Sequence, residues 1–327
     1  MKEQILSLNA VSRTFVSSRS WLGRKGYAVH AVNQVTLDVE QGQTLGIVGE
    51  SGCGKSTLAK MIVLLDQPTE GTIQFQGRQI HQLKRREKRK FRSQVQFVFQ
   101  DPLSSLNPRK TVRQILEAPL KHLTDWSSQK RRERVDELMD LVKLRPEFLD
   151  RHPHEFSGGQ SQRIGVARSI AASPELVVLD EPVSALDVSV QAQVLNLLRE
   201  IKSSQDLTYL FISHDLAVVE NLCDVVAVMY LGRIVEYGPR ELLFANPLHP
   251  YTHILLSSVP VPGQKPEGRA KLEGEPPSPS NLPQGCPFEP RCPKAQDKCR
   301  TDNPILETKA NRHRAACHFP MSDSETL

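Results

Sequence analysis

The sequence lacks any uninterrupted run of about 18 apolar residues, which is the length that a membrane-spanning helix requires. Its first residues, Met1 to Gln4, do not begin a secretory signal, which has a basic start and an apolar segment after it. We therefore expect a peripheral protein that resides in the cytoplasm or on the cytoplasmic face of a membrane. In that reducing compartment, the six cysteines are not expected to form a disulfide framework.

A large excess of one charge is also missing. The 42 basic and 37 acidic residues leave a net charge of +5, which only weakly suggests a nucleic-acid-binding protein and fits a membrane-facing surface equally well. The basic run from Lys84 to Lys90 is expected to be a solvated loop or helix face. Charged residues make up 24% of the chain and hydrophobic residues 39%, so disorder throughout is excluded.

Short apolar runs alternate with helical patterns from Ile5 to about Ser257, which predicts an α/β fold. Each run is nearly all apolar, as expected for a sheet that is covered on both faces. The segment from about Thr111 to Ala172 is expected to be a mostly helical insertion, with one helix over Ser127 to Leu144. The predicted strands are Thr44 to Val48, Val95 to Phe99, Leu176 to Leu179 and Thr208 to Ile212.

A glycine-rich segment from Gly49 to Thr57 has the spacing of a phosphate-binding loop, and it lies between a strand and an apolar helix pattern. In such a loop, backbone N–H groups and the helix N-terminus face the phosphate oxygens. Lys55 is expected to reach the outer phosphates, and Ser56 to bind Mg²⁺. The loop residues are Gly49, Glu50, Ser51, Gly52, Cys53, Gly54, Lys55, Ser56 and Thr57, and the helix pattern consists of Leu58, Met61, Ile62 and Leu65.

Two adjacent carboxylates, Asp180 and Glu181, follow the predicted strand that ends at Leu179. In phosphate-loop enzymes, a carboxylate at this place holds Mg²⁺ and a neighbouring polar group orients the attacking water. We therefore expect Asp180 to bind the metal, directly or through water, and Glu181 to act as the base or to position the water. The alternative is that the pair only ends a strand before Pro182.

A second glycine-containing turn precedes a helix that is expected to begin near Gln162. A Ser-Gly-Gly turn at a helix N-terminus can bind an anion. With the phosphate loop, this turn resembles the signature of the ATP-binding-cassette (ABC) ATPases, Leu-Ser-Gly-Gly-Gln, in which Phe156 here replaces the leucine. The resemblance implies that the turn contacts the nucleotide of a partner protomer. The turn consists of Ser157, Gly158, Gly159 and Gln160.

The same resemblance assigns four more positions. Gln100 matches a glutamine that reaches Mg²⁺ and the water, and Asp187 matches a loop that crosses the interface of an ATPase dimer. His214 matches a histidine that contacts the γ-phosphate. Phe15 is our choice for the aromatic residue that stacks on adenine, ahead of Tyr27 and Trp21.

The resemblance covers about residues 5–257 and implies an ABC nucleotide-binding domain of the phosphate-loop NTPase fold. Its core would comprise about residues 5–100 and 173–257, and its helical subdomain about residues 101–172. Residues 258–327 would form a small, irregular C-terminal region, since prolines and four of the six cysteines concentrate there. The two other cysteines, Cys53 and Cys223, are expected to be small packing residues.

Two further segments resemble the ATP-binding subunits of oligopeptide and dipeptide permeases, namely residues 103–109 and residues 246–252, which contain His249-Pro250-Tyr251. Some of those ATPases carry a [4Fe-4S] cluster in the C-terminal region. Zinc and ordinary free thiols stay open as alternatives, since structural zinc sites usually have closer cysteine pairs. The candidate ligands are Cys286, Cys292, Cys299 and Cys317.

The resemblance therefore implies an ATPase that hydrolyses ATP with Mg²⁺ and energises peptide import. It also implies a paralogous ATPase partner in a heterodimer, two transmembrane permease subunits, an extracytoplasmic peptide-binding protein and a location on the cytoplasmic face of the inner membrane. A soluble ABC ATPase that acts on nucleic acid or ribosomes, an exporter motor, and an importer motor for nickel or glutathione are the alternatives. No nucleic-acid partner is expected.

Overall fold

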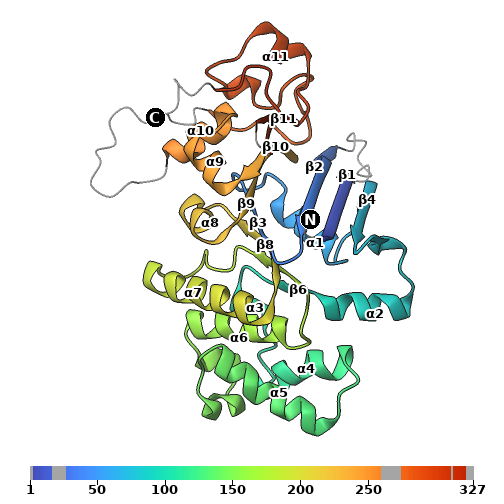
Figure 1. The fold of residues 1–327 in the computed structure, drawn as a ribbon, viewed down its shortest axis with the longest axis vertical. Helices are drawn as coiled ribbons and strands as arrows, with labels where there is room; N and C mark the ends of the chain where they lie inside the picture. Colours follow the sequence, from blue (N-terminus) through green and yellow to red (C-terminus); the bar gives the residue numbers. More distant parts are fainter. Residues whose placement is uncertain (1–2, 17–26, 259–273, 311, 322–327) are drawn as a thin grey trace, which may run out of the picture. The chain divides into compact units, whose positions relative to one another are not determined.

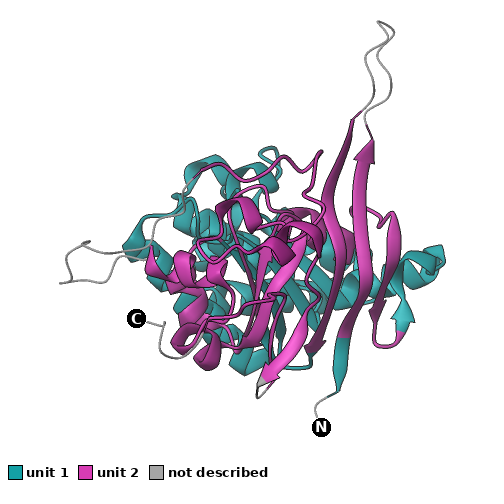
Figure 2. Cartoon of the chain, turned by 90° about the horizontal axis from the view of Figure 1, so that it is seen from above, with its two compact units in different colours: residues 1–5, 40–44, 78–213 teal, residues 6–39, 45–77, 214–327 magenta. Residues whose placement is uncertain are grey.

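The structure is a computed structural model that describes residues 3–16, 27–258, 274–310 and 312–321. The chain divides into two compact units, which Figure 2 colours separately. The first unit consists of residues 1–5, 40–44 and 78–213, and the second of residues 6–39, 45–77 and 214–327. The domain boundaries expected from the sequence stay a prediction.

The first unit is built on three parallel strands, in the order β8, β7, β6. Val95 lies opposite Leu176, and Leu176 opposite Thr208. Every residue of β7 and β8 is buried, which agrees with the apolar runs that predicted them. The strands are β6 (Val95–Val98), β7 (Leu176–Asp180) and β8 (Thr208–Ser213), and a short β5 (Arg78–Gln79) precedes them.

Helices make up most of the remaining first unit. Helix α4 packs against α5 and α6, and α6 packs against α7, as Figure 1 shows. The helices are α2 (Arg85–Gln94), α3 (Pro102–Ser105), α4 (Val112–Leu123), α5 (Ser128–Leu141), α6 (Gly158–Ile170) and α7 (Val188–Gln205), with 3₁₀ turns η1 (Ile80–Gln82), η2 (Pro146–Asp150) and η3 (Pro153–Glu155). Most side chains of the basic run in α2 are exposed, which agrees with the expected solvated helix face.

Two predicted helix boundaries need correction. Helix α6 begins at Gly158 and not near Gln162, because Ser157 caps it and Gln160 bonds back to the Ser157 N–H. Leu65 lies outside the helix that its apolar pattern predicted and is 59% exposed. That helix ends early because Leu64 adopts a left-handed conformation with φ of 59°.

The second unit contains a mixed sheet in the order β3, β9, β10, β12, β11. Strands β3 and β9 are parallel, and the other pairs are antiparallel. Two strands of the C-terminal region therefore extend the sheet that begins at β3. The strands are β3 (Thr44–Val48), β9 (Val225–Tyr230), β10 (Arg233–Pro239), β11 (Glu307–Ala310) and β12 (His313–Ala315).

A smaller sheet of the second unit contains β2, β1 and β4 in that order, with β1 and β4 antiparallel. These strands are β1 (Gln4–Val16), β2 (Ala28–Glu40) and β4 (Glu70–Phe75). The helices of this unit are α1 (Lys55–Ile62), α8 (Leu216–Leu222), α9 (Arg240–Ala245), α10 (Pro250–Ser257) and α11 (Asp297–Thr301), with the 3₁₀ turn η4 (Glu289–Arg291).

Candidate functional site

The glycine-rich loop connects β3 to α1, as the sequence predicted. Its glycines are required where the backbone of the loop approaches other backbone. A Cβ at Gly49 would collide with the Met229 carbonyl oxygen, and a Cβ at Gly54 would collide with the Ala31 carbonyl oxygen. Gly54 has φ of 110° and precedes α1 directly, so the loop turns sharply into the helix N-terminus.

Lys55 is buried at the start of α1, with an exposed fraction of 4%. Its Nζ donates to the carbonyl oxygens of Gly49 at 2.7 Å and Glu50 at 3.0 Å, which holds the ammonium group inside the curve of the loop. Ser56 and Thr57 follow in the first turn of α1. The positive end of this helix and the lysine charge are both suited to binding an anion such as phosphate.

Cys53 packs inside the same loop, as expected. Burial raises the pKa of the Cys53 thiol, although the neighbouring Lys55 charge opposes that shift. The Cys53 carbonyl oxygen accepts a hydrogen bond of 2.8 Å from Gly232 N–H, which links the loop to the turn between β9 and β10. Cys223 is also fully buried and contributes to packing.

The two carboxylates lie at the end of β7 in the first unit. Asp180 is the last residue of the strand and is 5% exposed. Glu181 has φ of 47°, a left-handed conformation that is unusual for a residue with a side chain, and its N–H donates to the Ile212 carbonyl oxygen at 2.9 Å. Such backbone conformations concentrate at functional sites.

Gln100 meets Glu181 directly. Its Nε2 donates to Glu181 Oε2 at 2.9 Å, although the two residues are 81 positions apart. The hydrogen bond helps to fix the orientation of the Glu181 carboxylate. The structure therefore brings together the predicted glutamine and the predicted base.

The signature turn caps α6 in the same unit. Ser157 Oγ accepts from Gln160 N–H at 3.4 Å, and Gln160 Oε1 accepts from Ser157 N–H at 3.1 Å. Gly159 is required because a Cβ there would collide with Val190 of α7. Asp187 is the N-cap residue of α7. The neighbouring Leu186 side chain lies close to Gly158, so the predicted interface loop lies beside the signature turn. Phe156 is buried and packs edge to face on Phe148, with ring centroids 5.5 Å apart.

The second unit holds the other two predicted residues. His214 is exposed and follows β8 directly. Phe15 is 41% exposed near the end of β1, and the Arg13 guanidinium lies 4.5 Å above its ring. Tyr27 is exposed, and Trp21 lies outside the described residues, so the choice of Phe15 stays a prediction.

Sequence reasoning missed a contact between the C-terminal region and the phosphate loop. Arg291 Nη1 and Nη2 donate to the two carboxylate oxygens of Glu50 at 2.8 and 3.2 Å, although 241 positions separate the residues. This bidentate contact raises the pKa of the Arg291 guanidinium. Glu50 N–H also donates to Tyr251 Oη at 3.0 Å, and the only sequence signal was that Tyr251 follows His249-Pro250.

The four cysteines of the C-terminal region line one small cavity of about 10 Å³, together with His249. Burial is the first cause that raises the pKa of the Cys286, Cys292 and Cys317 thiols, and that of Cys286 rises to about 11. Within the described ranges, however, no three His, Cys, Asp or Glu side chains are arranged to hold a metal ion. The side-chain geometry alone therefore does not support the expected iron–sulfur or zinc site.

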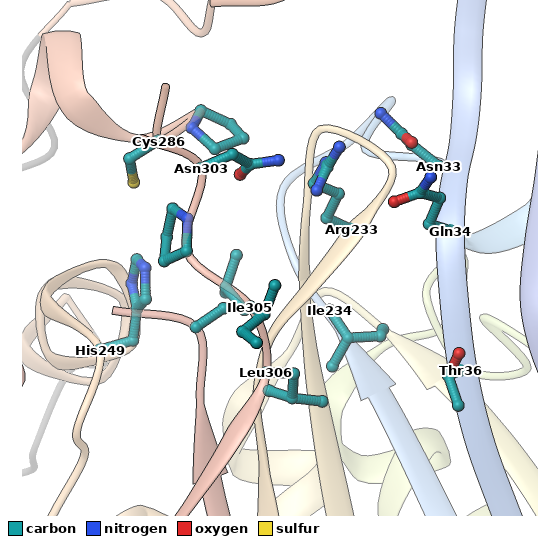
Figure 3. Close-up of a pocket in the computed structure, with 14 residues that line it drawn as sticks. Asn33, Gln34, Thr36, Arg233, Ile234, His249, Cys286, Asn303, Ile305 and Leu306 are labelled. Carbon is teal, nitrogen blue, oxygen red and sulfur yellow. The ribbon is translucent and has the colours of Figure 1, made fainter. Parts of the chain in front are cut away.

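A second pocket, of about 240 Å³, adjoins the cysteine cavity, since Cys286 and His249 line both. Figure 3 shows the asparagine and glutamine of β2, Asn33 and Gln34, opposite Arg233 of β10. Burial lowers the pKa of the Arg233 guanidinium. The C-terminal region is thus packed against β2 and β10, and it is not a detached appendage.

Comparison with known proteins assigns the family. Residues 32–184 match the family model described as ABC transporter, and residues 235–299 match that of the oligopeptide/dipeptide transporter, C-terminal region. The chain is 50% identical over 322 residues to the oligopeptide transport ATP-binding protein AppF of Bacillus subtilis, covering 97% of this chain and 98% of that protein. It is 48% identical to the dipeptide transport ATP-binding protein DppF of Haemophilus influenzae, with the same coverage.

The chain belongs to the ABC transporter ATP-binding subunits of the oligopeptide/dipeptide permease family. The fold agrees, since a dimeric ATP-binding cassette, MJ0796 bound to ADP and Pi, matches with a TM-score of 0.64 at 28% identity and covers 72% of this chain and 99% of its own. The family resemblance, the fold class and the ABC-type ATPase activity predicted from the sequence are thereby confirmed. Such an ATPase uses ATP and Mg²⁺.

Among the described residues, no helix is long and apolar enough to cross a membrane.

Proposed function

We propose that this subunit energises the import of di- or oligopeptides by hydrolysing ATP at composite sites in an ATPase dimer. The main support is that one chain contains both the phosphate loop and the C-terminal region typical of these transporters. The chain is also about 50% identical to a relative named for oligopeptide transport. Import of nickel, of glutathione or of another small solute is the nearest alternative, because in the proposed complex the solute would contact other chains.

At the phosphate loop, the backbone N–H groups and Lys55 would bind the nucleotide phosphates. Ser56, Gln100 and Asp180 would hold Mg²⁺, which neutralises the charge that develops on the phosphates. Phe15 would stack on the adenine ring, and His214 would contact the γ-phosphate. Support for these roles comes from the order of the motifs and from the buried Lys55 and Asp180.

Glu181 would accept a proton from the attacking water or hold that water in line, while Gln100 keeps its carboxylate oriented through the 2.9 Å hydrogen bond. Ser157, Gly158, Gly159 and Gln160 of a second protomer would complete each site, with Asp187 at the interface. The capped N-terminus of α6 supports this role, because it can face an anion.

The proposed partners are a paralogous ATPase, two transmembrane permease subunits and an extracytoplasmic peptide-binding protein, with the chain on the cytoplasmic face of the inner membrane. Purification of the native complex tests this proposal. Membrane permeases should copurify with the chain, whereas copurification with RNA at low salt would favour the alternative of a soluble ATPase acting on nucleic acid or ribosomes. Peptide uptake that depends on Lys55 would exclude an exporter.

The phosphate site is tested most directly by Lys55→Ala. Because Lys55 is the buried cation of the loop, we expect the affinity for MgATP to fall at least about tenfold, as for other buried charges that contact a ligand. Equilibrium binding of a fluorescent ATP analogue measures the change. Lys60→Ala is the control, since Lys60 lies in the same helix on an exposed face and should leave binding unchanged. Equal affinity of the Lys55 variant and the wild type would contradict the site.

We further propose that the four cysteines of the C-terminal region hold a [4Fe-4S] cluster, or alternatively zinc. They line one cavity, and the Nε2 of the buried His249 in its wall has no hydrogen-bond partner among the described residues. Since His249 Nδ1 accepts from Tyr251 N–H at 3.1 Å, the neutral ring carries its proton on Nε2, where a metal-bound sulfur would satisfy it. A metal bound by thiolates would cross-link this proline-rich region.

This assignment predicts a brown protein with broad visible absorption after anaerobic purification, and loss of that absorption in Cys299→Ser. Cys223→Ser is the control, since Cys223 is buried elsewhere in the second unit and should leave the spectrum unchanged. A colourless protein that contains one zinc per chain would assign zinc. A colourless, metal-free protein would leave the four side chains as ordinary thiols.

A further inference from the structure

Arg291, in the C-terminal region, is a buried charged partner of the phosphate loop. Only 4% of its side chain is exposed, and both of its terminal nitrogens donate to the Glu50 carboxylate, at 2.8 and 3.2 Å. Arg291 Nη1 also donates to Tyr230 Oη at 3.4 Å. A bidentate arginine fixes both the position and the orientation of a carboxylate, which a single point charge does not.

Every polar group of Glu50 forms a hydrogen bond or an ion pair. Its carboxylate binds Arg291, its N–H donates to Tyr251 Oη at 3.0 Å, and its carbonyl oxygen accepts from Lys55 Nζ at 3.0 Å. The residue lies between Gly49 and Ser51 in the phosphate loop. The conformation of the loop at this point therefore depends on one residue of α10 and one residue of the cysteine-bearing segment.

An aromatic cluster packs around these contacts. The rings of Tyr230, Tyr251 and Phe288 are buried, with centroids 4.7 Å apart for the two tyrosines and 5.3 and 5.4 Å from each tyrosine to Phe288. Phe288 directly precedes the turn η4 and Arg291 is its last residue, and both lie between Cys286 and Cys292. A displacement of this cysteine-bearing turn would thus move Arg291 and release Glu50.

Charge gives the contact a second role. An unpaired carboxylate in the phosphate loop would repel the nucleotide phosphates at short range, where water screens charge poorly. The Arg291 guanidinium cancels the Glu50 charge and leaves the Lys55 charge for the nucleotide. The 241 positions between Glu50 and Arg291 explain why no local pattern in the sequence reveals the pair.

We propose that Arg291 is a positioning residue of the ATP site: it orients and neutralises Glu50, so the cysteine-bearing C-terminal region sets the affinity of the phosphate loop for ATP. This inference rests on the proposed ATP-binding function and extends it to the control of that site by the segment next to Cys292.

Equilibrium binding of MgATP to the full-length chain tests the inference. We expect Arg291→Ala to weaken binding about tenfold, a loss of about 1.4 kcal/mol, and Arg291→Lys to weaken it less, because lysine keeps the charge but not the paired hydrogen bonds. The double variant Arg291→Ala with Glu50→Gln should recover most of the affinity, because it also removes the repelling carboxylate. A merely structural role of Arg291 would not produce that recovery.

Arg300→Ala is the matched control. Arg300 belongs to the same C-terminal region and pairs with Glu289 and Asp297, both at 3.2 Å, but its side chain is 67% exposed. This variant should bind MgATP as the wild type does, and thermal unfolding of all variants shows which of them remain folded.

Three outcomes would overturn the inference. Wild-type affinity of Arg291→Ala would show that the pair does not affect the loop, and a double variant as weak as Arg291→Ala would show that Glu50 does not mediate the effect. An equal loss in Arg300→Ala would assign the effect to general disruption of the region. In each case, the proposed function would still hold if the wild type binds MgATP and Lys55→Ala weakens that binding. A wild type that does not bind MgATP would contradict both the function and the inference.

Discussion

Glu181→Gln should lower the rate of ATP hydrolysis at least about 100-fold, because general base catalysis contributes about that much to the rate. Binding of MgATP should be unchanged. Glutamine has nearly the shape of glutamate and can still accept the hydrogen bond that Gln100 Nε2 donates at 2.9 Å. It cannot accept a proton from water at neutral pH. The variant should therefore accumulate as an ATP-bound dimer with its partner, measurable by phosphate release and by size-exclusion chromatography with MgATP.

A matched control is available at the other end of the same strand. Glu175 precedes β7, and its Oε1 accepts from Gln94 Nε2 at 2.7 Å, so it repeats the glutamine–glutamate hydrogen bond away from the proposed site. Glu175→Gln should hydrolyse ATP at nearly the wild-type rate. Undiminished turnover in Glu181→Gln, or an equal loss in both variants, would remove Glu181 from the role of base.

Much of the first unit could be predicted from the sequence because its central strands are buried on both faces. The predicted strand from Leu176 to Leu179 is β7 with one residue added, and the run from Thr208 to Ile212 is β8 with one residue added. Such runs are nearly all apolar, so their position depends little on distant contacts. The start of α6 was placed late because two glycines at its N-terminus have low helix propensity, which the Ser157 cap overrides.

Some features of the candidate site could likewise be predicted from the sequence, and others could not. The phosphate loop and the signature turn are continuous segments, so the spacing of their glycines and of Lys55 was sufficient to predict them. The left-handed conformation of Glu181 and the contact of Arg291 with Glu50 arise only when distant segments meet. The sequence also did not predict β11 and β12, the two strands of the C-terminal region that extend the sheet. The strand β12 has only three residues, and the many prolines of this region are typical of irregular structure.

The second large effect concerns the buried carboxylate of Glu236 on β10, and we expect Glu236→Ala to destabilise the second unit by about 3 to 5 kcal/mol. Glu236 has no exposed surface. Its Oε1 lies 2.7 Å from both His313 Nε2 on β12 and the Leu248 N–H, and its Oε2 accepts from His249 N–H at 2.9 Å. Alanine would leave these buried donors without their acceptor, so the penalty is that of several unsatisfied groups.

Urea unfolding, followed by tyrosine fluorescence and circular dichroism, measures this effect, and two further variants show its cause. Glu236→Gln keeps one acceptor oxygen but turns an N–H toward a donor, so it should cost less, about 1 to 3 kcal/mol. Glu307→Ala is the control. Glu307 lies on the edge strand β11, is 54% exposed and pairs with Lys309 at 3.0 Å. Its loss should change the free energy of unfolding by no more than about 0.5 kcal/mol. If Glu236→Ala were as stable as Glu307→Ala, the carboxylate would not be what joins β10, β12 and the start of α10.

Because His249 and Tyr251 follow directly from that junction, a loss of stability there should also weaken the Tyr251 contact to Glu50 and thereby lower the affinity for ATP.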